Sequence, residues 1–289
     1  MMRIKPLKDC RIHVWGGLGS QLFGISLALD LLDHFPKKQY TIIFHSSGVT
    51  RRSLDFELEQ APFKTSYVDD YKESNTVNNL SFTPKSLINP LVKNLLRTTG
   101  FLSEANDQLE FNNIKNWTST YRGHYSYRQI TTINTCKMIE LLESNKLYFY
   151  STNVGLEKIV SVHYRLGDLV ALKRSSLVDP ARLKSLMKSL SEQKVRPEFY
   201  LFSDNVQMAY SLLRDKKSSF NLMTLELDAW NTLAKLSFSR VFIGTNSKIS
   251  IWAAIFRSRL NIGDLTYLPI ELKGQVQRNL DSYPRIMFY

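Results

Sequence analysis

The sequence predicts an α/β fold in which helices alternate with the strands of a parallel sheet. In the second half, the apolar runs 159–164, 199–202 and 241–243 each lead through a polar turn into a helical pattern. Repeated β-loop-α units imply parallel strands, with ligands bound at the carboxyl ends of those strands. The 289 residues are 43% hydrophobic and 22% charged, which is ordinary for a soluble globular enzyme of one large or two modest domains.

The first half begins with a clear strand and helix. The predicted helix 21–32 places Leu22, Ile25, Leu29 and Leu32 on one face, and Ser20 suits its N-cap. Residues 46–110 are less regular, and Asn, Ser and Thr dominate 74–83, which favours an exposed loop there. The other elements expected in this half are strands 12–15 and 40–45 and helices 87–96 and 132–144.

A polar break at 151–155 suggests a boundary between domains 1–152 and 153–289. Beyond it the pattern is sharper. Pro180 suits the first position of a helix that runs to about residue 192. The remaining predicted elements are strands 159–164, 199–202 and 241–243 and helices 206–213, 230–238 and 247–257.

The net charge of +12 is unevenly distributed. Residues 1–155 carry 18 Lys and Arg against 14 Asp and Glu, whereas residues 156–289 carry 20 against 12. A basic half attracts phosphate-rich partners such as nucleic acid, anionic lipid or a nucleotide-sugar. No helix-turn-helix, RNP motif or zinc finger is recognisable, so nucleic acid is not expected as a partner.

The sequence indicates a cytoplasmic protein. No stretch approaches 18 apolar residues, and the first residues lack the apolar core of a signal peptide. Cys10 and Cys136 are too few for a disulfide framework, which fits a reducing compartment.

The most informative segment is Ser-Val-His-Tyr-Arg-Leu-Gly-Asp at 161–168. A strand here delivers Arg165, Gly167 and Asp168 into one tight turn. Arg165 offers a planar fork that fits a diphosphate, and Gly167 allows close approach of backbone to ligand. Asp168 is expected to position the arginine or to act as a base; the alternative is a buried Arg–Asp pair. His163 either contacts the donor or is a core histidine.

Two further segments accompany this turn: Gly-Gly-Leu-Gly-Ser-Gln-Leu-Phe at 16–23 and Gly-Thr-Asn-Ser-Lys-Ile-Ser-Ile-Trp-Ala-Ala at 244–254. Together the three resemble the inverting α-1,2-fucosyltransferases that use GDP-fucose, whose versions are G-G-L-G-N-Q-hydrophobic-F, H-x-R-R-G-D and N-S-x-F-S-W-W-A-A. A weaker fourth match is Tyr-Arg-Gly-His-Tyr at 121–125, near the family's G-Y-aromatic-Q segment. The resemblance runs from about residue 12 to residue 256.

The resemblance implies a GT-B-like architecture of two Rossmann-like halves facing a cleft. It implies an acceptor-side domain at 1–152 and a donor domain at 153–289. The implied reaction moves fucose from GDP-fucose to a sugar hydroxyl, the 2-OH of a galactoside, with inversion. Its setting would be surface polysaccharide or O-antigen synthesis, with an oligosaccharide or lipid-linked glycan as acceptor.

The glycine loop also follows from this resemblance. In the family, the loop that here contains Gly16, Gly17, Gly19 and Gln21 borders the cleft opposite the donor domain; the alternative is a tight βα turn. Leu22 stands where a dinucleotide fingerprint would have its last glycine, which disfavours an NAD site.

The sequence departs from the family at four places. Ser20 replaces an Asn, Leu166 replaces a second Arg, and Ile251 replaces the first Trp of a pair. Thr232 lies where an acidic residue is usual. The donor is therefore open between GDP-fucose and another nucleotide-sugar. If the strand continues, side chains 165 and 166 point opposite ways, so Leu166 meets a different surface from Arg165.

The diphosphate leaving group needs a cation, and the sequence has no Asp-x-Asp to hold a metal. The nearest patterns, at 57–59 and 226–228, lack a convincing strand-end context. We therefore expect no metal and no cofactor, with Arg165 and a helix N-terminus stabilising the charge. Asn246 and Ser247 open that helix and Lys248 adds charge; the alternative for the Asn-Ser pair is ordinary N-capping.

Other candidate residues lie at or near strand ends. Ser203 and Asp204 follow strand 199–202 and either reach the nucleotide or cap the next helix. Asp228 and Glu226 are outside candidates for the base. Trp252 is expected in the core.

A membrane contact is also suggested. A basic stretch could dock the anionic inner membrane face, through Lys173, Arg174, Arg182, Lys184, Lys188, Lys194 and Arg196. The alternative to an enzyme is a non-catalytic protein that binds nucleotides or nucleic acid through the same loops.

Overall fold

The structure is a computed structural model of the 289-residue chain, which divides into two compact units, Met1–Asn145 and Lys146–Tyr289. It describes residues 9–46, 57–70, 90–105, 114–123, 130–145, 159–167, 170, 177–192, 197–214, 220–261, 263–274 and 285–289. The predicted boundary between residues 152 and 153 and the predicted loop 74–83 lie outside these residues.

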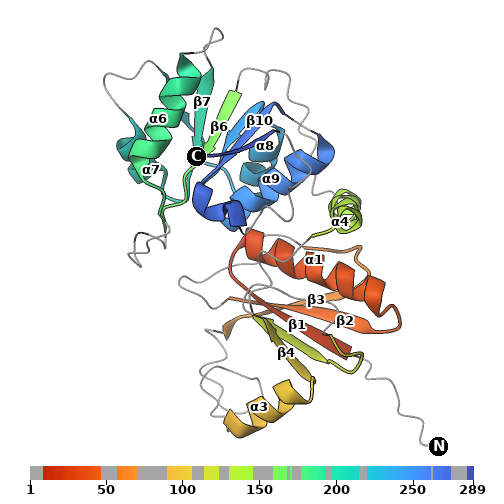
Figure 1. Cartoon of the computed structure of the whole chain (residues 1–289). Coiled ribbons are helices and arrows are strands. Elements are labelled where there is room, and N and C mark those ends of the chain that lie inside the picture. The colour runs from red at the N-terminus through yellow and green to blue at the C-terminus, as the bar shows by residue number, and fades with distance from the viewer. Residues whose placement is uncertain are drawn as a thin grey trace, which may run out of the picture. The chain divides into compact units, whose positions relative to one another are not determined.

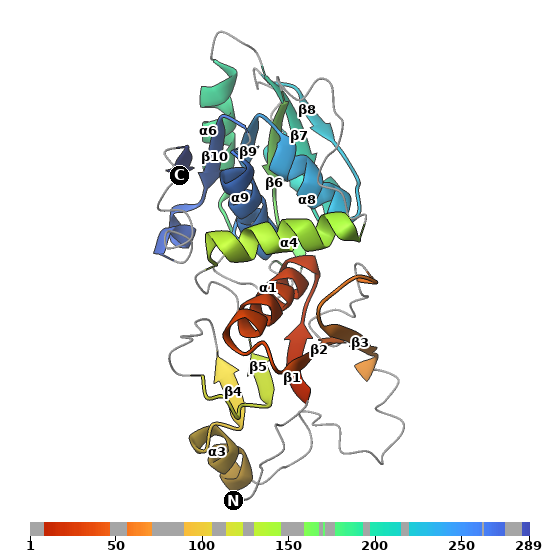
Figure 2. The same ribbon diagram turned by 90° about the vertical axis from the view of Figure 1, so that its right-hand side faces the viewer.

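The N-terminal unit is a five-stranded parallel sheet with strand order β3-β2-β1-β5-β4 (Figures 1 and 2). Strand β1 is central, so the chain builds β2 and β3 on one side of it and β5 and β4 on the other. The elements are β1 (Asp9–Trp15), α1 (Leu18–His34), β2 (Gln39–His45), β3 (Lys64–Val68), α3 (Pro90–Thr98), β4 (Leu102–Ala105), β5 (Thr120–Gly123) and α4 (Thr132–Ser144).

Helix α1 covers one face of this sheet because β1 alternates buried and partly exposed side chains. Cys10, Ile12 and Val14 are buried. A Cβ at Gly24 of α1 would overlap Val14, so the helix can pack closely on the strand only with glycine there. His13 and Trp15 point to the opposite face, because side chains alternate along a strand.

Polar side chains join α1 to α4 inside this unit. The Asn134 side chain donates to Asp30 Oδ1 at 2.6 Å and to the Ser26 carbonyl at 2.8 Å, while the Ser26 hydroxyl donates to Asn134 Oδ1 at 2.6 Å. All three side chains are buried, and each is satisfied, which is the condition for stable burial of polar groups.

The C-terminal unit is a six-stranded parallel sheet with strand order β11-β10-β9-β6-β7-β8. Taken from β8 to β11, this is the 3-2-1-4-5-6 order of Rossmann sheets. The elements are β6 (Ile159–His163), α6 (Pro180–Ser191), β7 (Glu198–Phe202), α7 (Val206–Leu213), β8 (Leu222–Thr224), α8 (Ala229–Phe238), β9 (Val241–Ile243), α9 (Lys248–Leu260), β10 (Leu265–Leu268), η3 (Ile270–Leu272) and β11 (Ile286–Phe288).

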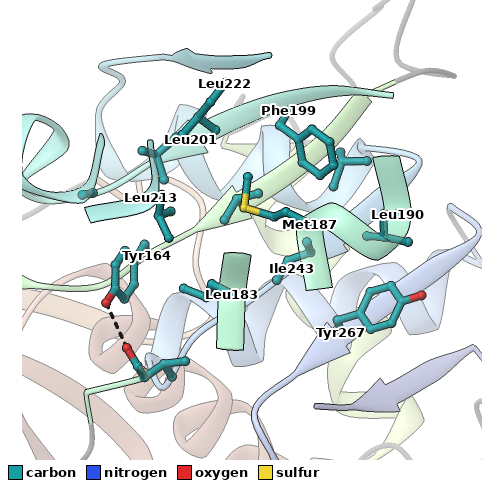
Figure 3. Close-up of a cluster of buried hydrophobic side chains, with 14 of the residues drawn as sticks. Tyr164, Leu183, Met187, Leu190, Phe199, Leu201, Leu213, Leu222, Ile243 and Tyr267 are labelled. Atoms are coloured by element: carbon teal, nitrogen blue, oxygen red, sulfur yellow. Dashed lines mark hydrogen bonds between the residues drawn. The ribbon is translucent and has the colours of Figure 1, made fainter. Parts of the chain in front are cut away.

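Helices cover both faces of this sheet, with α6 and α7 on one face and α8 and α9 together on the other (Figure 1). Alternate residues of β6 therefore face different helices. Val160, Val162 and Tyr164 enter the core under α6 and α7, where Figure 3 shows Tyr164 bonded to the Val178 carbonyl at 2.9 Å. Ser161 and His163 face the other way.

The structure confirms the predicted α/β fold with two Rossmann-like parallel-sheet units; that they face a cleft stays a prediction. Helices α4 and α7 and strand β9 have the predicted bounds. The start of α1 was predicted wrongly. The helix begins at Leu18 with Gly17 as its N-cap, so Ser20 lies in its first turn. Pro180 does occupy the first turn of α6, behind an Asp179 cap.

Six strands were not predicted: β3, β4, β5, β8, β10 and β11. Each has only three to five residues. Their formation depends on parallel neighbours, which the local pattern does not encode. In the described part of the chain, no helix has the length and apolar character needed to cross a membrane.

Candidate functional site

The candidate site lies at the carboxyl ends of β6, β7 and β9 in the C-terminal unit. From β6 the chain moves outward to β7 and β8, then returns to place β9 on the other side of β6. This reversal makes the β6/β9 pair the topological switch point, where open α/β sheets bind ligands. The sequence motifs at 161–168 and 244–254 meet at this point.

Asp204 organises the turn after β6. Its Oδ1 accepts hydrogen bonds from the backbone N–H of Leu166 at 2.9 Å and of Gly167 at 3.1 Å. Its Oδ2 lies 3.0 Å from Nε of Arg165. A Cβ at position 167 would overlap this carboxylate, so the arrangement requires glycine. One carboxylate therefore sets both the backbone of the turn and the direction of the guanidinium.

Arg165 and Leu166 have opposite environments, as the sequence predicts. The Arg165 side chain is 21% exposed and lies against Asp204. Leu166 is fully buried in the core under α6 and α7. Leu166 is thus a core residue, and it has no exposed surface to offer a ligand.

The segment after β9 forms the other side of the site. Ser247 is the N-cap of α9, and its hydroxyl accepts from the backbone N–H of Ser250 at 3.1 Å. Thr245, also buried, accepts the backbone N–H of Arg165 through its hydroxyl at 3.0 Å. This bond fixes the backbone of Arg165 beside the segment that leads into α9, whose N-terminal N–H groups carry partial positive charge.

His163 is a buried neutral histidine beneath this turn. Only 4% of it is exposed, and its Nδ1 lies 2.8 Å from Oγ of Ser250 and 3.4 Å from Oγ of Ser247. Burial, together with the Arg165 charge, lowers the pKa of His163 to about 4, against a smaller raising effect from Asp204. At neutral pH the imidazole therefore adds no charge next to Arg165.

The remaining predicted residues have varied positions. Ser203 donates to the Tyr164 carbonyl at 2.6 Å and so supports the same turn. The alternative that Ser203 or Asp204 caps α7 is wrong, because Asn205 is the N-cap. Asn246 and Lys248 flank the Ser247 cap, both half-buried. Trp252 is fully buried, as predicted. Asp168 lies outside the described residues.

The glycine loop of the N-terminal unit is a tight βα turn. Gly16 has φ +102°, a conformation that L side chains rarely adopt, and its carbonyl accepts from the Gln21 side chain at 3.3 Å. Gly17 caps α1, and Gly19 and Gln21 are buried in the helix. The described contacts of this loop are thus structural; its position relative to a donor stays a prediction.

Two polar contacts of the site, those of Thr245 and Ser250, were not anticipated. Ser250 lies three residues after the Ser247 cap, so one helical turn brings both hydroxyls beneath His163. The three-residue spacing of Ser247 and Ser250, at the start of a helix that Ser247 caps, is the sequence signal from which this contact could be predicted. Among the described residues, no group of three His, Cys, Asp or Glu side chains could hold a metal ion.

No protein-family model and no curated protein matches the sequence of this chain, so these comparisons assign it to no family. Among solved structures, the chain is similar to the glycosyl transferase family 9 protein from Veillonella parvula DSM 2008. The TM-score is 0.48 with 9% identity, covering 90% of this chain and 80% of that one.

Two further structures have a similar level of likeness. The E. coli heptosyltransferase WaaC with ADP-2-deoxy-2-fluoro heptose has a TM-score of 0.43 and 8% identity, covering 91% of this chain and 89% of that one. The S. aureus MnaA-UDP co-structure has a TM-score of 0.45 and 9% identity, covering 94% and 82%. Because these TM-scores are all below 0.5, the fold class rests on the strand order and pairing described above.

Proposed function

We propose that the protein is a glycosyltransferase that takes a sugar from a nucleoside diphosphate donor. The observation that supports this most is the junction of Arg165 with the N-terminus of α9 at the switch point of a Rossmann-like sheet. A planar cation and a helix N-terminus are both suited to a diphosphate, which is the leaving group of such donors.

In this proposal Arg165 stabilises the charge that develops on the diphosphate as the sugar leaves. Asp204 holds the guanidinium from its Nε side and keeps the backbone of the turn in place. The first turn of α9, with Lys248, adds positive potential near the same point. Neutral His163 avoids repulsion with Arg165 and contributes a polar contact. Such preorganised electrostatics is often the largest single contribution to catalysis.

We further propose that the donor is GDP-fucose and that the product is an α-1,2-linked fucoside formed with inversion on a galactoside. The support is the order and spacing of the three motifs at 16–23, 161–168 and 244–254. Burial of Leu166 is compatible with this donor, because a core side chain does not line its pocket. The biological setting we propose is O-antigen or other surface polysaccharide synthesis at the cytoplasmic face of the membrane.

The basic stretch that we propose for membrane contact is described only at Arg182, Lys184 and Lys188. Arg182 pairs with Glu271 at 2.6 Å, so its charge is partly neutralised, whereas Lys188 is exposed on α6. Exposed lysines near an anionic surface each contribute about 1 kcal/mol. Binding to anionic vesicles that weakens with salt, and little binding to neutral vesicles, is the expected result.

The function is tested by acceptor-dependent release of the nucleoside diphosphate from GDP-fucose, GDP-mannose and UDP-sugars, each offered with a panel of galactosides. We expect transfer from GDP-fucose. Transfer from a UDP-sugar alone would reject the donor but keep the reaction class. Binding of nucleotide without turnover on any acceptor would instead favour the non-catalytic alternative.

A further inference from the structure

Tyr289, the residue that follows β11, contacts the backbone at the start of the candidate site. Its hydroxyl donates a hydrogen bond to the carbonyl of Gly244 at 2.9 Å. Gly244 directly follows β9 and directly precedes Thr245, whose hydroxyl accepts the backbone N–H of Arg165. Strand β11 is at the edge of the sheet, and β10 lies between it and β9. The contact therefore joins the edge of the C-terminal sheet to its switch point.

The peptide unit between Gly244 and Thr245 is held from both sides. A trans peptide points its carbonyl and its N–H in opposite directions. The Gly244 carbonyl accepts from Tyr289, and the Thr245 N–H donates to Oγ of Ser250 at 3.2 Å. Thr245 and Ser250 are both buried, so bulk water does not compete for these groups. The orientation of the peptide therefore depends on two hydroxyl groups, one of which belongs to Tyr289.

This peptide is directly linked to the arginine turn. The Thr245 hydroxyl lies 3.0 Å from the backbone nitrogen of Arg165, so a rotation of the peptide would move the acceptor away from that N–H. The backbone here is also closely packed, since a Cβ at Gly244 would lie 2.9 Å from Leu268 and 3.0 Å from Ser250. A change in the peptide at 244–245 is therefore transmitted to the backbone of Arg165.

Tyr289 is itself fixed by backbone and side-chain contacts. Its N–H donates to the Leu268 carbonyl at 3.0 Å, and its own carbonyl accepts the N–H of Ile270 at 2.9 Å. The Arg182 guanidinium donates to the same carbonyl, and its central carbon lies 5.5 Å from the centroid of the Tyr289 ring. Arg182 in turn pairs with Glu271 at 2.6 Å. The donor of the bond to Gly244 is therefore held independently of the candidate site.

The direction of this hydrogen bond is the same at every pH near neutrality. A carbonyl can only accept, so the Tyr289 hydroxyl must donate. Burial raises the pKa of Tyr289 above the ordinary value of 10; Arg182 opposes this effect, and Glu271 and Tyr164 reinforce it. The phenol therefore keeps its proton and remains a donor.

We propose that Tyr289 is a positioning residue of the donor site: through the peptide at 244–245, its hydroxyl keeps the Thr245 hydroxyl where it binds the backbone of Arg165. This inference rests on the proposed function, in which Arg165 stabilises the diphosphate leaving group. Tyr289 touches no substrate and acts only by limiting the movement of the arginine turn. A small displacement of a preorganised cation weakens its interaction with the charge of the transition state.

The first test compares kcat/KM for sugar transfer in the full-length wild type, Tyr289→Phe and Tyr40→Phe. Tyr40→Phe is the matched control, because its buried hydroxyl also donates to a backbone carbonyl, that of Leu31 at 3.1 Å in the N-terminal unit. We expect Tyr289→Phe to lower kcat/KM about 10-fold, equivalent to about 1.4 kcal/mol. Tyr40→Phe should transfer sugar like the wild type, although it loses a hydrogen bond of the same kind.

A double-mutant cycle then shows whether Tyr289 acts through Thr245. Thr245→Val removes the hydroxyl that binds the Arg165 N–H and keeps the branched shape of the side chain. Once that hydroxyl is absent, the loss of the Tyr289 hydroxyl should have no further effect. The double variant should therefore be as active as Thr245→Val alone. Losses that multiply in the double variant would give Tyr289 a role independent of Thr245 and overturn the proposal.

A further measurement needs no turnover and follows amide hydrogen exchange by NMR of protein labelled with 15N. We expect the amides of Arg165 and Thr245 to exchange about 10-fold faster in Tyr289→Phe than in the wild type, because local opening at these two sites becomes easier. The amide of Phe242, inside β9, should exchange at an unchanged rate. Faster exchange that is uniform over the C-terminal unit would show a loss of overall stability alone and overturn the proposal.

The outcomes separate this inference from the proposed function. A wild type that transfers sugar, with a folded Tyr289→Phe that retains full kcat/KM, rejects the positioning role and keeps the transferase. A wild type without acceptor-dependent transfer rejects both. If Tyr289→Phe does not fold, Arg182→Met decides, because it removes a contact that holds Tyr289 and keeps the hydroxyl. Unchanged kcat/KM and unchanged exchange at Arg165 in that variant overturn the proposal.

Discussion

The two units present polar groups at the same place in their sheets, but they assemble them differently. In the C-terminal unit, two short motifs supply nearly every group, and one carboxylate, Asp204, orients a cation. In the N-terminal unit, Oδ1 of Asp70 lies 3.0 Å from Nδ1 of His45, whose Nε2 lies 2.9 Å from Nδ1 of His13 on the neighbouring strand. The comparison teaches that a cluster built from two short motifs can be encoded locally, whereas a cluster of side chains from several strands depends on strand order.

The largest effect that we expect is a loss of stability on substitution of Leu166. It tests whether this side chain is part of the core or lines the ligand site. Leu166→Arg buries a charge without a partner, so it should destabilise the C-terminal unit by at least about 3 kcal/mol. Urea unfolding measures this. Leu166→Met, which conserves volume, should cost less than about 1.5 kcal/mol. A stable and more active Leu166→Arg would place this side chain in the donor pocket.

A loss of activity of similar free energy is expected when Arg165 is replaced. Arg165→Ala should reduce kcat/KM about 100-fold or more, equivalent to about 3 kcal/mol of transition-state stabilisation. Arg165→Lys should also be poorly active, because a point charge cannot replace the planar fork. Arg214→Ala, at the exposed C-cap of α7, is the control. Near-normal turnover by a folded Arg165→Ala would contradict the proposed role.

The next effect concerns pH. The folded-state pKa of His163, about 4, lies below the ordinary 6.5, so the unfolded chain binds a proton first as the pH falls. The stability present above pH 6.5 is therefore lost progressively down to pH 4, by up to about 3 kcal/mol. Denaturant unfolding at several pH values measures this loss. His163→Gln should flatten the profile, and so should His13→Gln, because burial, with smaller effects of neighbouring groups, lowers the pKa of His13 to about 3. A wild-type profile without slope would argue against buried neutral histidines.

A smaller effect is expected at Gly167. A methyl group in Gly167→Ala would push the Asp204 carboxylate away from the turn, with a cost of about 1–3 kcal/mol in stability and about 10-fold in kcat/KM. The matched control is Gly274→Ala, where an added Cβ meets no atom within 4 Å. Equal behaviour of the two variants would show that Asp204 does not need its present position.

The smallest expected effect is that of chelation. Because the sequence lacks an Asp-x-Asp and offers Arg165 instead, transfer should continue in EDTA at nearly the same rate. A complete loss that only manganese or magnesium restores would assign the leaving-group charge to a metal.

Local sequence predicted the framework of the C-terminal candidate site, but not the contacts of Thr245 and Ser250. The apolar run before His163, the glycine at 167 and the serine cap of α9 each have a local physical signature, and they predicted the strand, the turn and the helix start. The sequence also predicted that the side chains of Arg165 and Leu166 meet different surroundings, because neighbouring side chains of an extended chain point to opposite sides.

Tertiary structure decided which distant groups meet. Asp204 was recognised only as a strand-end carboxylate, and its bonds to residues 166 and 167 depend on the pairing of β6 with β7. In the N-terminal unit, His45 lies between His13 and Asp70, and Arg122 lies over the Trp15 ring. No local sequence pattern connects these residues. Strand order brings them together, and strand order follows from long-range pairing and burial, which periodicity within one segment cannot encode.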